Sequence, residues 1–360
     1  KNEIIEEVPE VDAVLGTTSY GDILKAINEA MEGKHFEEFK DIDYLPEKLG
    51  KRVLTTGGHF GYLKIAEGCD KHCTYCIIPK LRGKFRSVPM ERLIEQAKEM
   101  AEEGVKELIL VAQETTVYGT DIYGKKSLHV LLKELCEIKG IRWIRVLYCY
   151  PEEIYDELIQ TMKEEKKICH YLDLPIQHAS DRILKRMGRR TTQAELVAIV
   201  NKLRQEIPDI VLRTTLISGF PGETQEDHEE LMGFVDEMEF DRLGVFTYSA
   251  EEDTPAATMP DQVPEEVKEE RRDEIMELQQ EISYDKGTDR IGQELLVMIE
   301  GKVADESAYI GRTYGDAPKV DGYIFVQTGE LLMTGDFAKV RVTGALEYDL
   351  IGELADEYTE

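Results

Sequence analysis

Residues 66–79 read AEGCDKHCTYCIIP and place Cys69, Cys73 and Cys76 in a Cys-x3-Cys-x2-Cys triplet. Structural zinc sites take four protein ligands, and iron–sulfur clusters that only carry electrons usually take four cysteines. Three thiolates on one short loop instead suit a four-iron cluster whose fourth iron is open to a substrate or cofactor. The alternative is a zinc site completed by His72 or by a distant cysteine, but this spacing is not that of a zinc ribbon or finger. The loop therefore predicts an open iron–sulfur site.

Short apolar segments alternate with longer amphipathic segments on both sides of this loop, from about residue 62 to about residue 286. Six β–α units in this order predict an α/β fold with a parallel sheet, either a barrel or an open part of one. Chemistry in such folds collects at the carboxyl ends of the strands, and the cysteine loop follows the first expected strand. The expected strands are 62–66, 107–112, 141–147, 171–175, 210–218 and 242–248, and the expected helices are 90–103, 128–138, 152–164, 192–206 and 224–238.

The two ends of the chain have different patterns. Three prolines within 254–264 mark a break, a charged helix is expected from Glu265 to about Ser283, and short alternating strands with many glycines follow. Strands at 294–299, 309–312, 322–326 and 339–345 predict a small all-β module, most simply a five-stranded barrel. The first 55 residues predict acidic helices with turns at Gly16 and Gly50, as the end of a preceding domain plus a connector. The expected domains are 1–55, 56–288 and 289–360.

The composition is that of a globular protein, with 42% hydrophobic and 32% charged residues among 360. No apolar run approaches the length of a membrane span, and the start at Lys1 has neither an initiator Met nor the apolar core of a signal peptide. Cys136, Cys149 and Cys169 are scattered and predict buried apolar side chains in a reducing compartment. We therefore expect a fragment of a longer cytoplasmic chain with no membrane partner.

The formal net charge is −29. A chain with this charge repels a phosphate backbone unless it carries a local basic patch, and it attracts a basic partner. Solubility alone is the alternative explanation of such a charge.

Polar side chains stand where the expected strands end. Gln113 follows the second strand and can donate or accept hydrogen bonds, while Gln177 and His178 follow the fourth. Arg213 is expected to point into a barrel that is otherwise apolar, where it could face a carboxylate. A structural role is the more economical expectation for His178, as it is for His72 and His170.

The fifth expected strand continues into Ile217-Ser218-Gly219-Phe220-Pro221-Gly222-Glu223-Thr224. Two glycines and a proline with an apolar pair suit a tight turn packed against a flat ring such as adenine. The alternative is that Glu223 and Thr224 simply start a helix. The order of these motifs behind a three-cysteine loop favours the cofactor interpretation.

Segments 68–79, 81–83, 112–119, 172–178 and 217–224 resemble the methylthiotransferase branch of radical S-adenosylmethionine (SAM) enzymes. The resemblance covers essentially the whole chain, and residues from about 289 resemble the C-terminal TRAM module of that family. It implies a partial (β/α)6 TIM-like barrel, a five-stranded OB-like barrel, and insertion of a methylthio group into an unactivated C–H bond. It also implies a second four-iron cluster on three cysteines upstream of Lys1, so that this fragment holds one.

The resemblance is closer to the ribosomal-protein modifiers of that branch (the RimO type) than to the tRNA-adenosine modifiers (the MiaB type). The tRNA enzymes typically carry basic residues where Glu251 and Glu252 stand, and Asp253 replaces a glycine usual in the family. The implied substrate is an aspartate of the small-subunit ribosomal protein S-twelve, modified at its β-carbon. The segments that carry this closer resemblance are 147–153, 177–182 and 248–252.

The charge of the C-terminal module supports the same choice. Residues 290–360 hold six Lys/Arg against fourteen Asp/Glu, a balance of −8. A barrel this acidic suits a basic ribosomal protein better than RNA, so RNA binding should not dominate. The tRNA enzyme stays open as an alternative, as does a zinc-stabilised module that docks on ribosomes without catalysis.

The resemblance also implies site residues, cofactors and partners. Cys69, Cys73 and Cys76 would hold a [4Fe–4S] cluster that, once reduced by a flavodoxin or ferredoxin, cleaves SAM to a radical that takes hydrogen from the substrate carbon. By position, Tyr75 and Phe220 would line the adenine site. Gln113, Gln177 and Arg213 would line the polar end of the cofactor.

Overall fold

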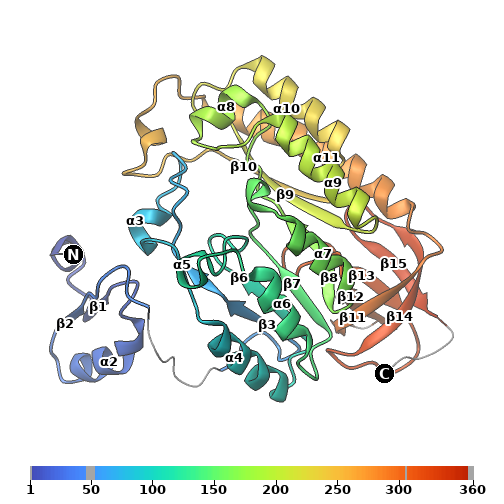
Figure 1. Ribbon diagram of the computed structural model, residues 1–360, viewed down its shortest axis with the longest axis horizontal. Coiled ribbons are helices and arrows are strands. Elements are labelled where there is room, and N and C mark those ends of the chain that lie inside the picture. The colour runs from blue at the N-terminus through green and yellow to red at the C-terminus, as the bar shows by residue number, and fades with distance from the viewer. Residues whose placement is uncertain (1, 46–52, 305, 356–360) are drawn as a thin grey trace.

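The computed structural model describes residues 2–45, 53–304 and 306–355, and its centre is a six-stranded sheet (Figure 1). Neighbouring strands are all parallel and follow one another in chain order, with β3 and β10 at the two edges. A sheet with this order and two free edges is an open part of a barrel, as expected. Its strands are β3 (Phe60–Lys64), β6 (Glu107–Val111), β7 (Trp143–Val146), β8 (Ile168–Asp173), β9 (Val211–Ser218) and β10 (Arg242–Thr247).

Successive side chains of each strand point to opposite faces of the sheet, and helices cover the face that carries the apolar side chains. In β6, Leu108 and Leu110 pack into the main core with helix residues such as Leu93 and Leu131, whereas Glu107 faces the other side. Two of the helices begin with capping boxes, at Thr192 and Thr224, which satisfy their first backbone N–H groups. The covering helices are α4 (Met90–Glu102), α6 (Leu128–Cys136), α7 (Asp156–Glu164), α9 (Gln193–Glu206), α10 (Gln225–Met238) and α11 (Glu265–Thr288), with short α5 (Thr120–Tyr123) and α8 (Asp181–Arg186) at their ends.

The cysteine loop has its own base, which differs from the expected first strand. That strand ends at Lys64, and Ala66–Glu67 forms a separate strand, β4, paired antiparallel with β5 (Arg86–Ser87). The loop and the short helix α3 (Ile78–Arg82) lie between the two. The expected helix 152–164 is also divided, because a 3-10 turn, η2 (Pro151–Glu153), precedes α7 and the backbone at Ile154 is extended.

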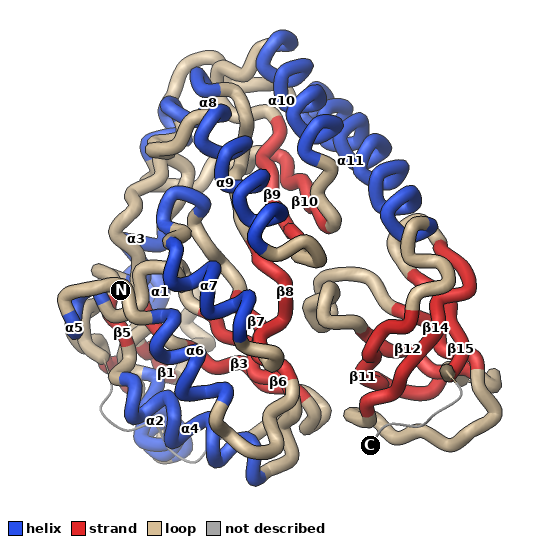
Figure 2. Tube along the Cα trace, turned by 45° about the vertical axis from the view of Figure 1, so that its right-hand side comes forward, coloured by secondary structure: helices blue, strands red, loops and turns tan. Residues whose placement is uncertain are grey.

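The C-terminal module is a closed five-stranded barrel, as predicted. Figure 2 shows α11 leading from the top of the sheet to this barrel, and the helix continues to Thr288, five residues beyond its expected end. A second hydrophobic core fills the barrel, with Val297, Ile324 and Val340 fully buried. The strands are β11 (Glu294–Lys302), β12 (Ala308–Arg312), β13 (Ile324–Gln327), β14 (Phe337–Ala345) and β15 (Leu350–Leu354).

The barrel closes the amino-terminal end of the sheet, opposite the cysteine loop. Trp143 at the start of β7 packs edge-on against Phe337 of β14, with ring centroids 4.8 Å apart. Glu107 of β6 is fully buried between Arg145 of β7 (2.8 Å) and Arg312 of β12 (2.7 Å). Apolar packing and a buried ion network therefore join the two modules.

Residues 2–45 form a small unit that differs from the expected acidic helices. Helices α1 (Asn2–Glu7) and α2 (Ile23–Met31) are present, with η1 (Tyr20–Asp22) before α2, but strands β1 (Ala13–Leu15) and β2 (Phe36–Glu38) pair in parallel. Strands of three residues are too short to show an alternating pattern. The turn expected at Gly16 is present, and Gly50 lies outside the described residues.

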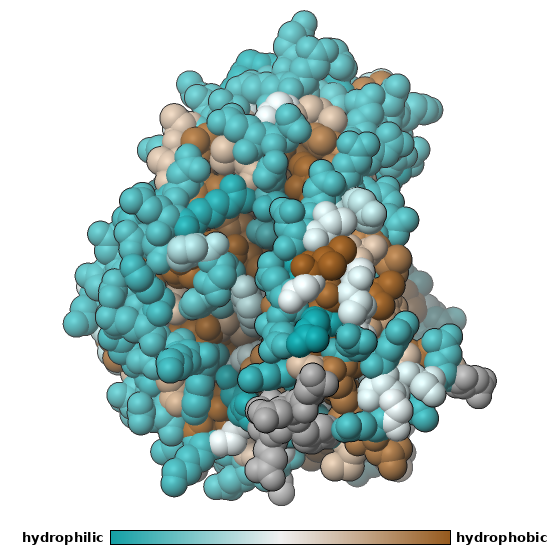
Figure 3. Space-filling view, turned by 90° about the vertical axis from the view of Figure 1, so that its right-hand side faces the viewer, coloured by the Kyte–Doolittle hydropathy of each residue, from teal (hydrophilic) through white to brown (hydrophobic). Residues whose placement is uncertain are grey.

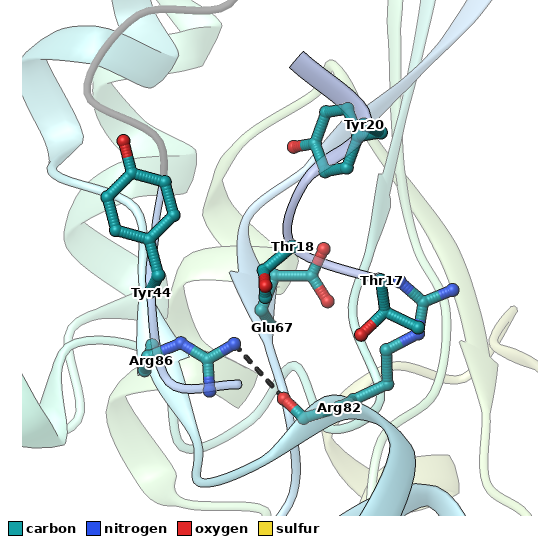
Figure 4. A pocket seen from close by; sticks show the side chains of 7 residues that line it. All are labelled: Thr17, Thr18, Tyr20, Tyr44, Glu67, Arg82 and Arg86. Atoms are coloured by element: carbon teal, nitrogen blue, oxygen red, sulfur yellow. Dashed lines mark hydrogen bonds between the residues drawn. The ribbon is translucent and has the colours of Figure 1, made fainter. Parts of the chain in front are cut away.

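This unit contacts the segments that follow the cysteine loop, α3 and β5, beside the small pocket shown in Figure 4. Thr17 donates a hydrogen bond to the Leu81 carbonyl oxygen (3.0 Å), and Asp43 accepts from Arg86 (3.2 Å). The small pocket between Thr18, Tyr44 and Arg86 has a volume of only about 10 Å³, which is room for about one water molecule.

Hydrophilic residues cover most of the face in Figure 3, and the hydrophobic residues visible there form separate patches. None of the helices in the described ranges combines the length and the apolar character that a membrane span requires.

Candidate active site

The cysteine loop is fixed by backbone contacts at both ends. Gly68 turns the chain into the loop with φ of 75°, and a Cβ atom there would lie 2.1 Å from the Lys84 carbonyl oxygen. The Cys69 N–H donates to the Gly83 carbonyl oxygen (3.2 Å), and the Thr74 N–H donates to that of Met187 (2.9 Å). Only glycine fits at Gly68, so the entry to the loop is specified by the sequence.

The three thiols lie together but do not surround one ion. Cys69 and Cys73 are buried and Cys76 is half-buried, and burial raises the pKa of Cys69 to about 11. Within the described ranges, no group of three or more His, Cys, Asp or Glu side chains could hold a metal ion. Each cysteine of a four-iron cluster binds a different iron, and three thiolates on one loop are the ligands that a cluster with an open iron takes. The chemistry of the donor set therefore fits such a cluster.

A buried arginine that sequence reasoning missed lies beside the loop. The Arg189 side chain is 1% exposed, and its guanidinium lies over the Tyr150 ring, 4.3 Å from the centroid. Its Nη2 donates to the Pro175 carbonyl oxygen (3.1 Å), whereas Nε and Nη1 have no hydrogen-bond partner. Arg189 pairs with Glu152 at 3.8 Å, and its two unused donor nitrogens can bind a further anion. Its contacts come from strand ends far away in the sequence, so no local pattern indicated it.

A buried carboxylate that no sequence pattern indicated, Glu114, lies near the cysteine loop. Glu114 follows β6 and accepts from the Thr116 N–H (2.8 Å) through one oxygen, while its other oxygen has no partner. Burial raises the pKa of Glu114 to about 7. The predicted neighbour Gln113 also has a buried Oε1 without a partner. Glu114, Cys69 and Lys71 line a cavity of about 220 Å³.

The structure brings together the two aromatic residues predicted for the adenine site. Tyr75 and Phe220 meet edge-on, with centroids 6.3 Å apart, and Phe220 also packs on Tyr248 at 5.3 Å. Phe220 is fully buried in this cluster. The turn that carries it is fixed by Glu223, which accepts from the N–H groups of Gly219 (2.8 Å) and Phe220 (3.1 Å).

Non-glycine residues with left-handed backbones gather on the loops that follow the strands. Gln177 has φ of 73°, Tyr148 has 60° and His72 has 53°. Such conformations are strained and concentrate at functional sites. Asp253, where the resemblance leads us to expect glycine, has φ of 66°. Asp253 therefore keeps the conformation that glycine allows.

The predicted histidine role is consistent with the structure. His178 is fully buried, its Nδ1 accepts from the Ser180 N–H (2.9 Å), and its Nε2 lies 3.5 Å from Glu223. These contacts hold two loops together, as a structural histidine does.

Arg213 lies in surroundings that differ from the expectation. The sheet interior around it is charged rather than apolar, because Asp173 of β8 (2.7 Å) and Asp321 of the C-terminal barrel (3.3 Å) both pair with it. Tyr171 also donates a hydrogen bond to Asp321 (2.8 Å). Arg213 does face carboxylates, but they are the chain's own. Its contact with the cofactor stays a prediction, as do those of Gln113 and Gln177.

The remaining cysteines are buried, as predicted. Cys136, Cys149 and Cys169 form no disulfide, and Cys149 lies 3.3 Å from the Thr115 hydroxyl.

Comparisons with known proteins agree on both modules. Residues 63–235 match the Radical SAM superfamily, and residues 291–355 match the TRAM domain. Ribosomal protein uS12 methylthiotransferase RimO of Lachnoclostridium phytofermentans is 64% identical over 98% of this chain and 80% of its own length. The protein of the same name from Clostridioides difficile is 48% identical over 99% of this chain and 80% of its own. Among solved structures, coproporphyrinogen III oxidase from Escherichia coli covers 79% of this chain and 66% of its own at 17% identity, with a TM-score of 0.49.

Proposed function

The chain belongs to the ribosomal protein uS12 methylthiotransferases, and from this membership we propose how its residues serve that reaction. The reaction is the addition of a methylthio group to the β-carbon of an aspartate in uS12. The observation that carries this function is the identity of 64% over 98% of the chain. The three-cysteine loop at the carboxyl ends of the strands is consistent with it.

The cluster and SAM, when bound, supply the radical chemistry that opens an unactivated C–H bond. We assign the cluster to Cys69, Cys73 and Cys76. The buried Arg189, with two unused donor nitrogens, suits the carboxylate of SAM, and the unpaired oxygen of Glu114 suits its ammonium group. These two groups extend the predicted polar end, to which Gln113, Gln177 and Arg213 were assigned.

The apolar cluster of Tyr75, Phe220 and Tyr248 suits the adenine end of the cofactor, since it offers ring edges and faces beside the cysteine loop. The chain's task at this end is to orient the cofactor and exclude water.

The charge of the C-terminal barrel supports a protein substrate. Of its six Lys/Arg, Arg312 is fully buried and Arg341 pairs with Glu294 (2.8 Å). This leaves fewer cations for a phosphate backbone than the sequence count suggests. We propose a basic protein rather than tRNA as the partner of this enzyme.

An electron donor and a cellular location are part of the same proposal. A flavodoxin or ferredoxin would supply the electron to the cluster, since the cluster must be reduced before it can cleave SAM. Six free cysteines fit a reducing compartment, and a ribosomal-protein substrate fits the cytoplasm.

Mass spectrometry on a strain that lacks the full-length gene tests this function. Loss of the methylthio mass from the uS12 aspartate peptide, with tRNA hydrolysate unchanged, is the expected result. Loss from adenosine in tRNA would instead support the alternative. Brown colour and bound iron after anaerobic purification are also expected, and their absence would favour a zinc-stabilised binding module.

A further inference from the structure

Tyr150 reaches the cysteine loop from the end of β7. Its hydroxyl oxygen lies 3.6 Å from Cys73 Sγ, within hydrogen-bond distance for sulfur. The same loop, residues 147–153, carries part of the resemblance noted in the sequence, and the cofactor contacts proposed above do not use it. The question is what a phenol does beside a cluster ligand.

The Tyr150 ring is held by cations from two other segments. Arg189, after α8, lies 4.3 Å from the ring centroid, and Lys71, inside the cysteine loop, lies 4.9 Å from it. Lys71 is itself paired with Glu153, three residues after Tyr150. Cation–ring contacts of this kind are favourable, more so where water is excluded. The hydroxyl is therefore positioned by three segments that meet only in the folded chain.

The direction of the hydrogen bond follows from the chemistry of the ligand. A cysteine that binds iron has lost its proton, so its sulfur can only accept, and Tyr150 must donate. Reduction of a cluster adds negative charge that is shared by its sulfur ligands. A donated hydrogen bond then stabilises the reduced form more than the oxidised form, which raises the reduction potential.

We propose that Tyr150 sets the reduction potential of the cluster by donating a hydrogen bond to the Cys73 thiolate, with Arg189 and Lys71 holding its ring in place. This inference rests on the proposed cluster ligands. Tyr150 makes the cluster easier to reduce, and so acts on the first electron transfer of the reaction without touching the substrate.

The test is a redox titration of the reconstituted chain, followed by the electron paramagnetic resonance signal of the reduced cluster. Tyr150→Phe keeps the ring and removes only the hydroxyl. We expect a more negative midpoint potential, with the ratio of reduced to oxidised cluster at a fixed potential falling roughly three- to tenfold, the equilibrium factor of one ordinary hydrogen bond.

Tyr148→Phe is the matched control, because Tyr148 lies on the same loop, is 52% exposed, and has no hydrogen bond to a cysteine among the described contacts. Its potential should equal that of the parent. Equal potentials for the parent and Tyr150→Phe at equal iron content would overturn the inference. A parent chain that binds no iron would instead overturn the proposed cluster ligands.

Discussion

Replacing Glu107 with glutamine tests how firmly the C-terminal barrel is held against the sheet. The carboxylate is fully buried and neutralises two buried arginines, Arg145 and Arg312. Removing one member of a buried ion network typically costs about 3–5 kcal/mol. Arg145 keeps the Tyr314 carbonyl and Arg312 keeps Glu300, so the lower end applies. We expect a loss of about 3 kcal/mol, or roughly a 100-fold shift of the equilibrium away from the folded state.

The chain carries its own reporter for this change. Trp143 is its single tryptophan and packs against Phe337 at the interface, so its fluorescence follows separation of the barrel from the sheet. Urea titrations of the parent and of Glu107→Gln should show the variant's tryptophan transition at a clearly lower denaturant concentration.

Lowering the pH should reduce the difference between the urea transitions of the parent and of Glu107→Gln. Burial alone raises the pKa of Glu107, but Arg145 and Arg312 outweigh burial and hold the pKa below its ordinary value of about 4.5. The stabilisation from the ionised carboxylate is therefore complete above that value and is lost as the pH falls below it. The parent's transition should approach that of the variant on acidification.

Glu294→Gln is the control, since Glu294 forms an exposed pair with Arg341, and such pairs contribute about 0–1 kcal/mol. Equal shifts for Glu107→Gln and Glu294→Gln would refute the claim that buried charge joins the modules.

Three further variants address the site. Cys76→Ala should abolish SAM cleavage while the chain still folds, and release of 5′-deoxyadenosine by this variant would remove Cys76 from the cluster ligands. Gly68→Ala should lower the iron bound per chain, because its Cβ would meet the Lys84 carbonyl; Gly33→Ala, with φ of 73° and open space, shares the backbone strain and should keep its iron. Glu114→Gln should weaken SAM binding by roughly 10- to 100-fold, the factor of one hydrogen bond to a charged group, as measured by calorimetry on the iron-loaded chain. An unchanged dissociation constant would exclude Glu114 from the cofactor site.

The sheet could be predicted because its strands carry local patterns. The short apolar run around Leu108-Ile109-Leu110 is typical of a buried strand, and the alternation of six such segments with amphipathic segments indicates the topology. The cysteine triplet is likewise local in sequence. Strands β1 and β2, with three residues each, and the separate strand β4, with two, carry no such pattern.

Most of the side-chain contacts in the site could not be predicted, because they join residues that are far apart in the sequence. Arg189 and Glu114 are recognised as candidate site residues only from their burial and their unpaired atoms, which the sequence does not show. Arg213 was expected among apolar neighbours, but Asp321, which pairs with it, comes from another module 108 residues later. Composition gives the number of charges in a chain and says nothing of which ones are buried together.

The buried pair of Glu107 and Arg312 also has a consequence for how the chain is made. The two residues are 205 positions apart. At about 5–20 residues per second, the ribosome delivers Arg312 roughly 10–40 s after Glu107. During that interval the amino-terminal end of the sheet is uncovered, with Trp143 and the Glu107–Arg145 pair in water. The cysteine loop lies at the opposite end, and the last residue along the chain among its described backbone hydrogen-bond partners is Ala256, whose N–H donates to the Thr74 carbonyl oxygen. A nascent chain can therefore form the backbone contacts of its cysteine loop while its other end is still open to chaperones.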